Sequence, residues 1–194
     1  MGVVDDADAD ADAGLLELAR RGDEDAFSGL FSRYQRAIYR YAAYMCGRHA
    51  GDDIVQETFM AVLRQTGRHD ALRGPVAGYL FGIARHVVMK RLASRKDAPF
   101  TEPVDGDVSD VAAMDAATAL DDLTRAETID AVRAAVQSLP PAYREAVVLC
   151  DFQEMDYADA ADLMQCPIGT VRSRLHRART LLTTKLAATA CLRR

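Results

Sequence analysis

The residue types best suited to chemistry lie in one basic run near the C-terminus. Between Ile168 and Arg179 the chain carries four arginines and one histidine. Guanidinium groups form bidentate hydrogen bonds with guanine edges and with phosphates, and the hydroxyl groups of Thr170 and Ser173 can bond to either. The run therefore indicates nucleic-acid binding rather than covalent catalysis.

A helix over this run would separate its polar residues from an apolar stripe. At about 100° per residue, Val171, Leu175, Ala178 and Leu182 fall beside Ile168. The stripe can pack on a preceding helix. The opposite face and its flanks carry the residues that we expect to reach duplex DNA: Gly169, Thr170, Arg172, Ser173, Arg174, His176 and Arg177.

A short helix and a tight turn are predicted just before the basic helix. The apolar spacing over residues 157–164 is helical, and Pro167 suits the first turn of the second helix, where its missing N–H costs nothing. Two such helices form a helix-turn-helix, whose second helix enters the major groove. An ordinary amphipathic helix with a solvated basic face is the alternative, since short patterns are not specific.

A second group of basic and aromatic residues lies in the N-terminal half. The predicted helix over residues 76–95 combines aromatic with basic side chains, and single-stranded DNA binding needs both. Tyr79 could equally be plain core. The loop over residues 67–75 precedes this helix. The candidate contacts to melted DNA are Arg68, His69, Arg73, Tyr79, Arg85, His86 and Lys90.

A third candidate surface is acidic. Asp52, Asp53, Gln56 and Glu57 share the start of a predicted helix. Taken alone they favour a solvated helix start, because acids near a helix N-terminus are stabilised by the dipole.

Four segments, taken in order, resemble one known family. They are residues 52–59, 79–86, 138–149 and 157–179. Together they resemble the extracytoplasmic-function (ECF) group of bacterial sigma factors, and the resemblance covers about residues 14–97 and 126–186.

Four positions depart from the usual family pattern. Tyr79 stands where Trp is common, His86 where Asn is common, and Gln165 with Cys166 replaces a usual Gly-Ile pair in the turn. These departures bear on which promoter is read more than on the activity.

The resemblance implies a function for each candidate surface. The acidic face would dock on a basic coiled coil of core RNA polymerase, and the helix at 76–95 would open the minus-ten element. The loop at 67–75 would receive a base flipped out of that element, and the basic helix at 167–186 would read the minus-thirty-five element. The implied partners are core RNA polymerase, promoter DNA as duplex and as melted single strand, and an anti-sigma factor.

Charge and periodicity together predict an all-α chain of two small helical domains joined by an acidic flexible linker. The net charge is −5, but residues 1–14 and 102–127 hold 13 of the 29 acids and one of the 24 bases. The remainder, 23 bases against 16 acids, is basic, as expected of a nucleic-acid binder. The predicted divisions are a disordered acidic tail (1–13), a region 2-like domain (14–97), the linker (98–125) and a region 4-like domain (126–194).

Other functions find less support in the sequence. We find no nucleophile–base constellation, phosphate-cradling loop or metal motif, and expect neither catalysis nor a cofactor. An Asp-rich N-terminus, with no apolar stretch of membrane-spanning length, predicts a cytoplasmic chain without membrane insertion.

Two alternatives stay open. One is a stand-alone helix-turn-helix regulator, and the other is a metal or redox sensor built from Cys150, Cys166, Cys191 and His176.

Overall fold

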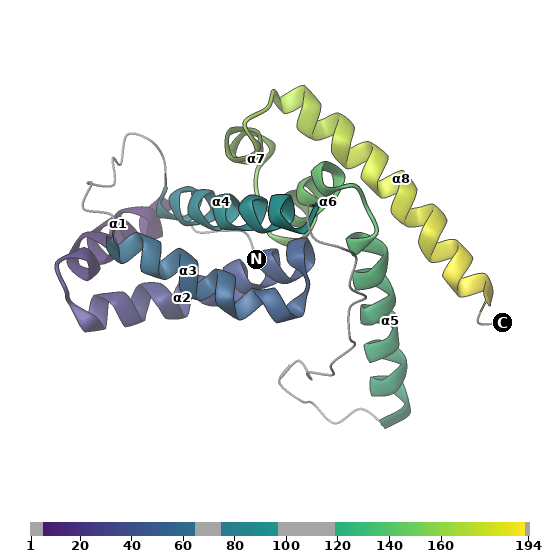
Figure 1. The fold of residues 1–194 in the computed structure, drawn as a ribbon, viewed down its shortest axis with the longest axis horizontal. Coiled ribbons are helices and arrows are strands. Elements are labelled where there is room, and N and C mark those ends of the chain that lie inside the picture. The colour runs from purple at the N-terminus through teal and green to yellow at the C-terminus, as the bar shows by residue number, and fades with distance from the viewer. Residues whose placement is uncertain (1–5, 65–74, 97–118, 193–194) are drawn as a thin grey trace.

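The fold was analysed in a computed structural model that describes residues 6–64, 75–96 and 119–192, with side chains for 11–64, 75–94 and 128–187. These residues form helices and contain no strand, which confirms the all-α prediction (Figure 1). The elements are α1 (Asp6–Arg20), α2 (Glu24–Cys46), η1 (Arg48–Ala50), α3 (Gly51–Arg64), α4 (Val76–Lys96), α5 (Ala119–Gln137), α6 (Pro141–Val147), η3 (Val148–Phe152), α7 (Tyr157–Met164) and α8 (Ile168–Leu192).

Helices α1 to α4 make the N-terminal domain around the long helix α2. Asp23 caps α2, because its side chain accepts a hydrogen bond of 2.8 Å from the backbone N–H of Ala26. Leu30, Ile38 and Tyr41 recur at helical spacing and are fully buried. Their stripe faces α3 and α4, which lie alongside α2 (Figure 1).

Helix α1 occupies part of the segment that the sequence predicted to be a disordered tail. Residues 1–13 were expected to be a disordered acidic segment, but α1 begins at Asp6. Asp12 is fully buried and accepts hydrogen bonds from Tyr34 and Arg33 of α2. Alternating Ala and Asp reads as low complexity by composition, yet Ala favours helix and acids favour a helix start. The partners of Asp12 lie more than twenty residues away, so the local pattern could not reveal them.

The C-terminal domain runs from α5 to α8. Helix α5 begins at Ala119, so the last residues of the predicted linker (98–125) are helical, and the rest of that linker lies outside the described residues. Val171, Leu175 and Ala178 of α8 are buried, which confirms the predicted apolar stripe, but Ile168 at its start is 40% exposed. Figure 1 shows α8 (yellow) extending past the rest of the domain.

The turn between α7 and α8 uses an unusual residue. Gln165 adopts the left-handed conformation, with φ 53° and ψ 47°, where glycine is the usual choice. The backbone N–H of Cys166 donates to the carbonyl oxygen of Ala161 at 3.0 Å and closes the end of α7. The sequence departure at this turn is therefore accommodated without loss of the helix-turn-helix.

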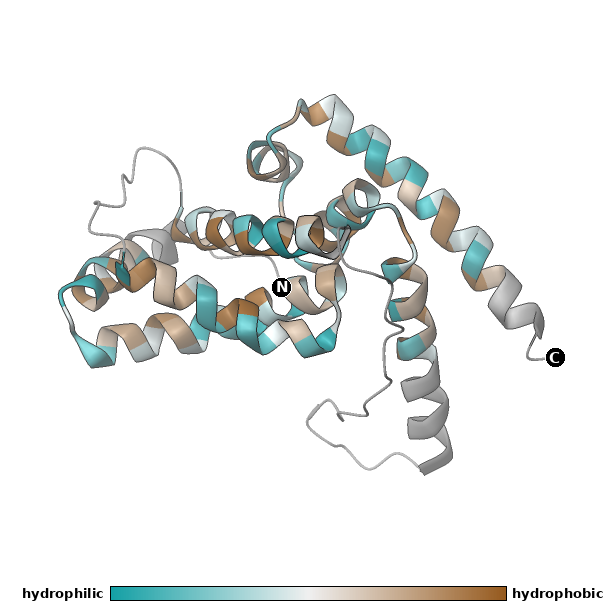
Figure 2. Ribbon diagram, viewed as in Figure 1, coloured by the Kyte–Doolittle hydropathy of each residue, from teal (hydrophilic) through white to brown (hydrophobic). Residues whose placement is uncertain are grey.

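The two domains share one continuous hydrophobic core. Helix α2 contacts α5, α6 and η3, and α4 contacts α7. Apolar residues, brown in Figure 2, recur along the helices of both domains. Buried Tyr41 and Phe81 of the first domain belong to the same cluster as Val148 and Leu149 of the second. The chain is therefore closed, with its domains packed on each other.

Candidate nucleic-acid and polymerase interfaces

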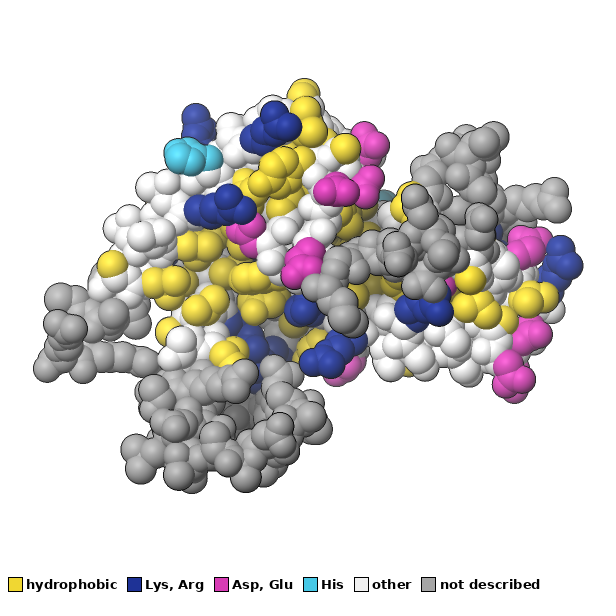
Figure 3. All heavy atoms as spheres, turned by 180° about the vertical axis from the view of Figure 1, so that it is seen from behind, with side chains coloured by type: hydrophobic (Ala, Val, Ile, Leu, Met, Phe, Trp, Pro, Cys, Tyr) yellow, Lys and Arg dark blue, Asp and Glu magenta, His cyan; other side chains and the backbone are white. Residues whose placement is uncertain are grey.

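The polar face of α8 is open to solvent. Gly169, Arg172, Ser173, His176 and Arg177 are exposed. Figure 3 shows basic side chains and a histidine along the outer side of the helix-turn-helix. The two other candidates on this helix, Thr170 and Arg174, are half-buried.

Neighbouring helices hold some of these side chains in place. Arg177 donates to the hydroxyl of Tyr143 on α6 at 3.4 Å, and Arg174 donates to the Sγ atom of Cys166 at 3.7 Å. Both contacts are long and weak, so the guanidinium groups can exchange them for stronger bonds to bases or phosphates.

On α4, Tyr79 packs against the first helix. Arg20 donates to the Tyr79 hydroxyl at 2.7 Å, and its Cζ atom lies 5.2 Å from the ring centroid. The side chain is half-buried. The Tyr79 ring is thus partly buried against the core, with its hydroxyl bonded to α1.

Arg85 is the α4 residue that the second domain covers. Its Nε atom donates to Oε1 of Glu145 at 2.7 Å, and the Glu145 side chain is only 3% exposed. The Tyr41 hydroxyl donates to the same carboxylate oxygen at 3.2 Å. Burial, and then the negative charge of Glu145, raises the pKa of Tyr41 well above its usual value. Three elements therefore meet at one carboxylate, because Tyr41 is on α2, Arg85 on α4 and Glu145 on α6.

The remaining two candidates on α4, His86 and Lys90, are exposed. The loop candidates Arg68, His69 and Arg73 lie outside the described residues. The structure thus brings Arg85, His86 and Lys90 together on one helix and covers the first of them.

Further polar contacts join α2 to the second domain. Gln153 is buried, accepts a hydrogen bond from Arg40 at 2.8 Å and donates to the carbonyl oxygen of Ala37 at 3.0 Å. Arg144 donates to the carbonyl oxygen of Met45 at 2.7 Å. Sequence reasoning missed these residues, because nothing in the local pattern around Gln153 or Glu145 marks a partner in the other domain.

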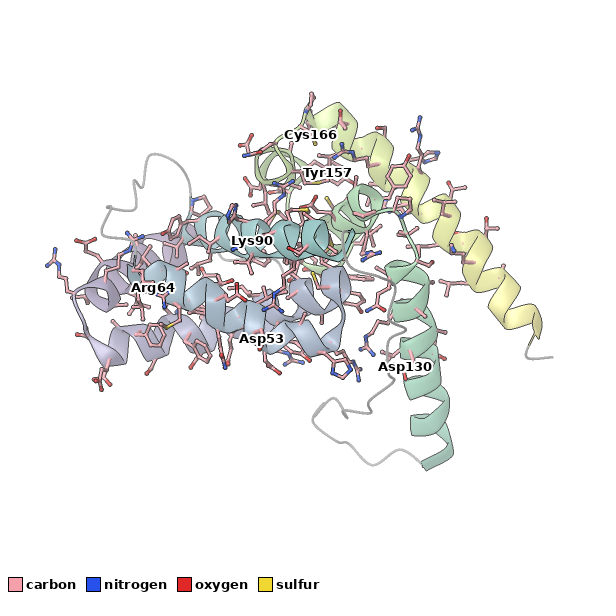
Figure 4. All side chains as sticks on the ribbon, viewed as in Figure 1. Asp53, Arg64, Lys90, Asp130, Tyr157 and Cys166 are labelled. Atoms are coloured by element: carbon pink, nitrogen blue, oxygen red, sulfur yellow. The ribbon has the colours of Figure 1, made fainter. Side chains whose placement is uncertain are left out.

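The acidic candidates lie together on the outer face of α3. Asp52, Asp53, Gln56 and Glu57 are all exposed. Arg91 of α4 donates to Oε1 of Glu57 at 2.5 Å and to Oδ2 of Asp53 at 3.3 Å. Figure 4 labels Asp53 on α3 and Lys90 on the neighbouring α4.

Arg91 was not among the predicted site residues. Its hydrogen bond to Glu57 is the main cause that raises its pKa. The pair is solvated on both sides and adds little stability. It does fix the two carboxylates on one side of α3, where a shallow groove runs between α3 and α4 past Met60 and Val87.

The sensor alternative finds no assembled site in the described part of the chain. No three metal-ligating side chains meet there, and Cys191 lies beyond the described side chains. Cys46, Cys150 and Cys166 are free thiols. Burial, and then the charge of Asp151, raises the pKa of Cys150 to about 11, which leaves it unreactive near neutral pH.

Comparison with known proteins identifies the family. Residues 30–97 match the family described as Sigma-70 region 2, and residues 129–182 match Sigma-70, region 4. The ECF RNA polymerase sigma-E factor of Haemophilus influenzae is 31% identical over 182 residues, which are 90% of this chain and 95% of that protein. The chain belongs to the extracytoplasmic-function group of RNA polymerase sigma factors. An RNA polymerase sigma-H factor of Pseudomonas aeruginosa is 35% identical over 180 residues, 87% of this sigma factor and 90% of that one.

Two solved structures share the fold of this sigma factor. The sigma factor RpoE of Bartonella quintana, in complex with the anti-sigma factor NepR, superposes with a TM-score of 0.66 at 23% identity over 83% of this chain and 96% of that one. CnrH, in complex with the cytosolic domain of CnrY, gives 0.65 at 24% identity over 92% and 98%. Among the described helices of this sigma factor, none combines the length and apolar character that a membrane crossing requires.

As a member of this group, the chain binds core RNA polymerase and directs promoter-specific transcription initiation.

Proposed function

We propose that this sigma factor reads the minus-thirty-five element with α8 and opens the minus-ten element with α4 and the loop before it. The observation that carries the proposal is the open polar face of α8, where Arg172, Ser173 and Arg177 are exposed opposite a buried apolar stripe. The readers of duplex DNA are Gly169, Thr170, Arg172, Ser173, Arg174, His176 and Arg177. The contacts to melted DNA are Arg68, His69, Arg73, Tyr79, Arg85, His86 and Lys90.

The exposed face of α3 is the proposed contact to polymerase. Asp52, Asp53, Gln56 and Glu57 present carboxylate and amide oxygens to solvent. A basic partner surface matches them in charge, and complementary charge speeds association and fixes register. Arg91 supports the proposal, because it holds Asp53 and Glu57 toward the same side.

The closed arrangement implies an order of events. Arg85 donates through Nε to Glu145 and through Nη2 to the carbonyl oxygen of Met164, 3.5 Å away, so the second domain covers the guanidinium that a DNA phosphate would need. The domains therefore separate before α4 engages melted DNA. An anti-sigma factor is the proposed partner of the closed form, by analogy with the complex of RpoE with NepR, and it would cover the same polymerase and DNA surfaces.

The two domains and the segment between them have separate roles. Residues 14–97 act on polymerase and the minus-ten element, residues 126–194 act on the minus-thirty-five element, and the acidic segment between them passes through the polymerase. The protein performs no chemistry of its own and works in the cytoplasm, where polymerase is found.

Run-off transcription with core RNA polymerase on a promoter library tests this function. The full chain should give discrete transcripts that core polymerase alone does not, and residues 126–194 alone should give none, because the two promoter elements are read by different domains. A chain that binds duplex DNA but starts no transcript would instead be a stand-alone helix-turn-helix regulator.

A further inference from the structure

Two arginines on the same side of α8 are held by the protein in opposite ways. Arg172 and Arg179 are seven residues apart, which is about two helical turns, so they share one face. Both are exposed. Arg172 contacts Tyr157 at the start of α7. Arg179 contacts Asp151 on η3, and Tyr157 contributes after Asp151 to its raised pKa.

Arg172 is held by an aromatic ring rather than by a hydrogen-bond acceptor. Its Cζ atom lies 5.9 Å from the centroid of the Tyr157 ring, within range of a cation–π contact. Figure 4 labels Tyr157 at the start of α7 and Cys166 in the turn before α8. A cation–π contact engages the positive charge of the guanidinium and does not itself require any of its N–H donors. Within the described residues, Arg172 donates no hydrogen bond, so the donors that a guanine or phosphate would need are available.

Arg179 is instead held through the N–H donors of its guanidinium group. Its Nε and Nη2 atoms donate to the two carboxylate oxygens of Asp151, at 3.1 and 2.5 Å. Bidentate recognition of guanine uses the same fork of N–H groups. The hydrogen bond to Asp151 is also the first cause that raises the pKa of Arg179. A fork already filled by a carboxylate cannot read a base at the same time.

Building on the proposed function, we propose that Tyr157 positions Arg172 for the minus-thirty-five element, while Asp151 keeps Arg179 out of DNA contact. Contacts within the helix-turn-helix domain thereby determine which of two arginines on the same face of α8 contacts the minus-thirty-five element. Tyr157 limits the rotamers of Arg172 without competing for its donors. Arg179 instead ties α8 to η3 through Asp151 and contributes to the fold rather than to recognition.

The first test compares Arg172→Ala with Arg179→Ala, which remove the same side chain and the same charge from one helix. Promoter binding by the reconstituted holoenzyme is measured across a salt series. We expect Arg172→Ala to weaken binding and to lower the salt slope by about one phosphate contact, and Arg179→Ala to leave the slope unchanged. A slope that falls equally in both variants would overturn the role given to Asp151.

The second test is a double-mutant cycle between Tyr157 and Arg172 in the same holoenzyme. Tyr157→Ala should weaken promoter binding about two- to fivefold, the value of an exposed cation–π contact, and Tyr157→Phe should bind as the wild type does. In an Arg172→Ala background, Tyr157→Ala should have no further effect. An equal loss in both backgrounds, or a Phe variant as weak as the Ala variant, would show that Tyr157 does not act through Arg172.

Failure of the positioning roles can be distinguished from failure of the proposed function. If the wild-type holoenzyme binds the promoter and starts transcripts while Tyr157→Ala and both arginine variants match it, the positioning roles are wrong and the function stands. If the wild-type chain directs no promoter-specific start, the proposed function itself fails.

Discussion

The two DNA-facing helices, α4 and α8, carry similar patterns but stand in different surroundings. Each combines an apolar stripe with basic residues on other faces. On α8, Arg172, Arg177 and Arg179 are exposed, and the protein groups that bond Arg177 and Arg179 belong to their own domain. On α4 the central guanidinium, Arg85, is paired with a buried carboxylate of the other domain. Comparable patterns thus give one surface ready for duplex DNA and one that becomes available only when the domains part.

The difference comes from the position of each helix in the fold. Helix α4 lies against α1, α2, α3 and α7, so little of its circumference is free. Helix α8 contacts α5, α6 and α7 and projects beyond them (Figure 1). The packed position of α4 lets Glu145 of a neighbouring helix pair with Arg85, whereas the projecting position of α8 leaves Arg172 and Arg177 exposed.

Glu145→Ala should have the largest effect on the covered surface. It leaves the Arg85 guanidinium and the Tyr41 hydroxyl without their carboxylate, and we expect the free energy of unfolding to fall by about 2–3 kcal/mol, somewhat less than for a fully buried pair because Arg85 is 21% exposed. Chemical denaturation measures the change. Glu145→Gln, which keeps the shape and an acceptor, is the matched control and should cost less. An Ala variant as stable as wild type would mean that the pair does not hold the domains closed.

Arg177→Ala should act on the open surface and leave stability unchanged. If Arg177 reads a guanine edge, the substitution should cost about 1–3 kcal/mol at that base pair and relax specificity there. If it holds only a phosphate, affinity should fall equally for all sequences, with a smaller salt slope. Promoter binding by the holoenzyme distinguishes the two, with Arg36→Ala on α2 as a control of equal charge. Unchanged affinity and unchanged slope together would remove Arg177 from the interface.

Reversing Asp53 and Glu57 to Lys should weaken assembly with core polymerase by about tenfold, because charge complementarity at an interface is replaced by repulsion. The fold should persist, since both carboxylates are exposed and their pairs with Arg91 are solvated. Gel filtration with core polymerase measures assembly, and circular dichroism checks the fold. Glu24→Lys with Asp25→Lys on α2 makes the same charge change elsewhere. Normal assembly of the α3 variant would refute the polymerase role.

The smallest effect should be a loss of stability at high pH. The folded chain holds the Tyr41 proton more tightly than the unfolded chain, because the pKa of Tyr41 is raised by burial and by Glu145. This stabilisation is complete below the unfolded pKa of about 10 and is lost as pH rises above it, by about 1 kcal/mol or less at pH 10.5.

Tyr41→Phe should remove this part of the pH dependence in unfolding measurements between pH 8 and 10.5. Both proteins should also carry Cys150→Ala, because the raised pKa of Cys150, about 11, makes that thiol contribute in an overlapping range. Parallel pH profiles for the Tyr and Phe forms would show that Tyr41 does not titrate with folding.

Local patterns predicted the elements that position the candidate site. The apolar stripe of α8, the helix before it and the acidic face of α3 all lie where helical periodicity places them, since each depends on residues three or four apart. The pairs that close the chain could not be predicted in this way. Arg85 and Glu145 are 60 residues apart, and Tyr41 and Glu145 are 104 apart.

The helical turns at Asp6–Asp12 escaped prediction for the same reason. Composition alone suggested a solvated tail, and only the contacts of Asp12 with α2 explain why a carboxylate is buried there. Long-range pairing of charged groups, rather than helix formation, is what the sequence left undetermined.

The distance between the two domains, free and in the holoenzyme, tests the central claim most directly. Spin labels at exposed positions Ser28 on α2 and Thr183 on α8, in a chain whose native cysteines are replaced, would report it by pulsed electron resonance. The free chain should give one narrow distance, and the holoenzyme on promoter DNA a clearly different one, because Arg85 must leave Glu145 to reach the melted strand. An identical distance in both states would contradict the exchange of Glu145 for DNA.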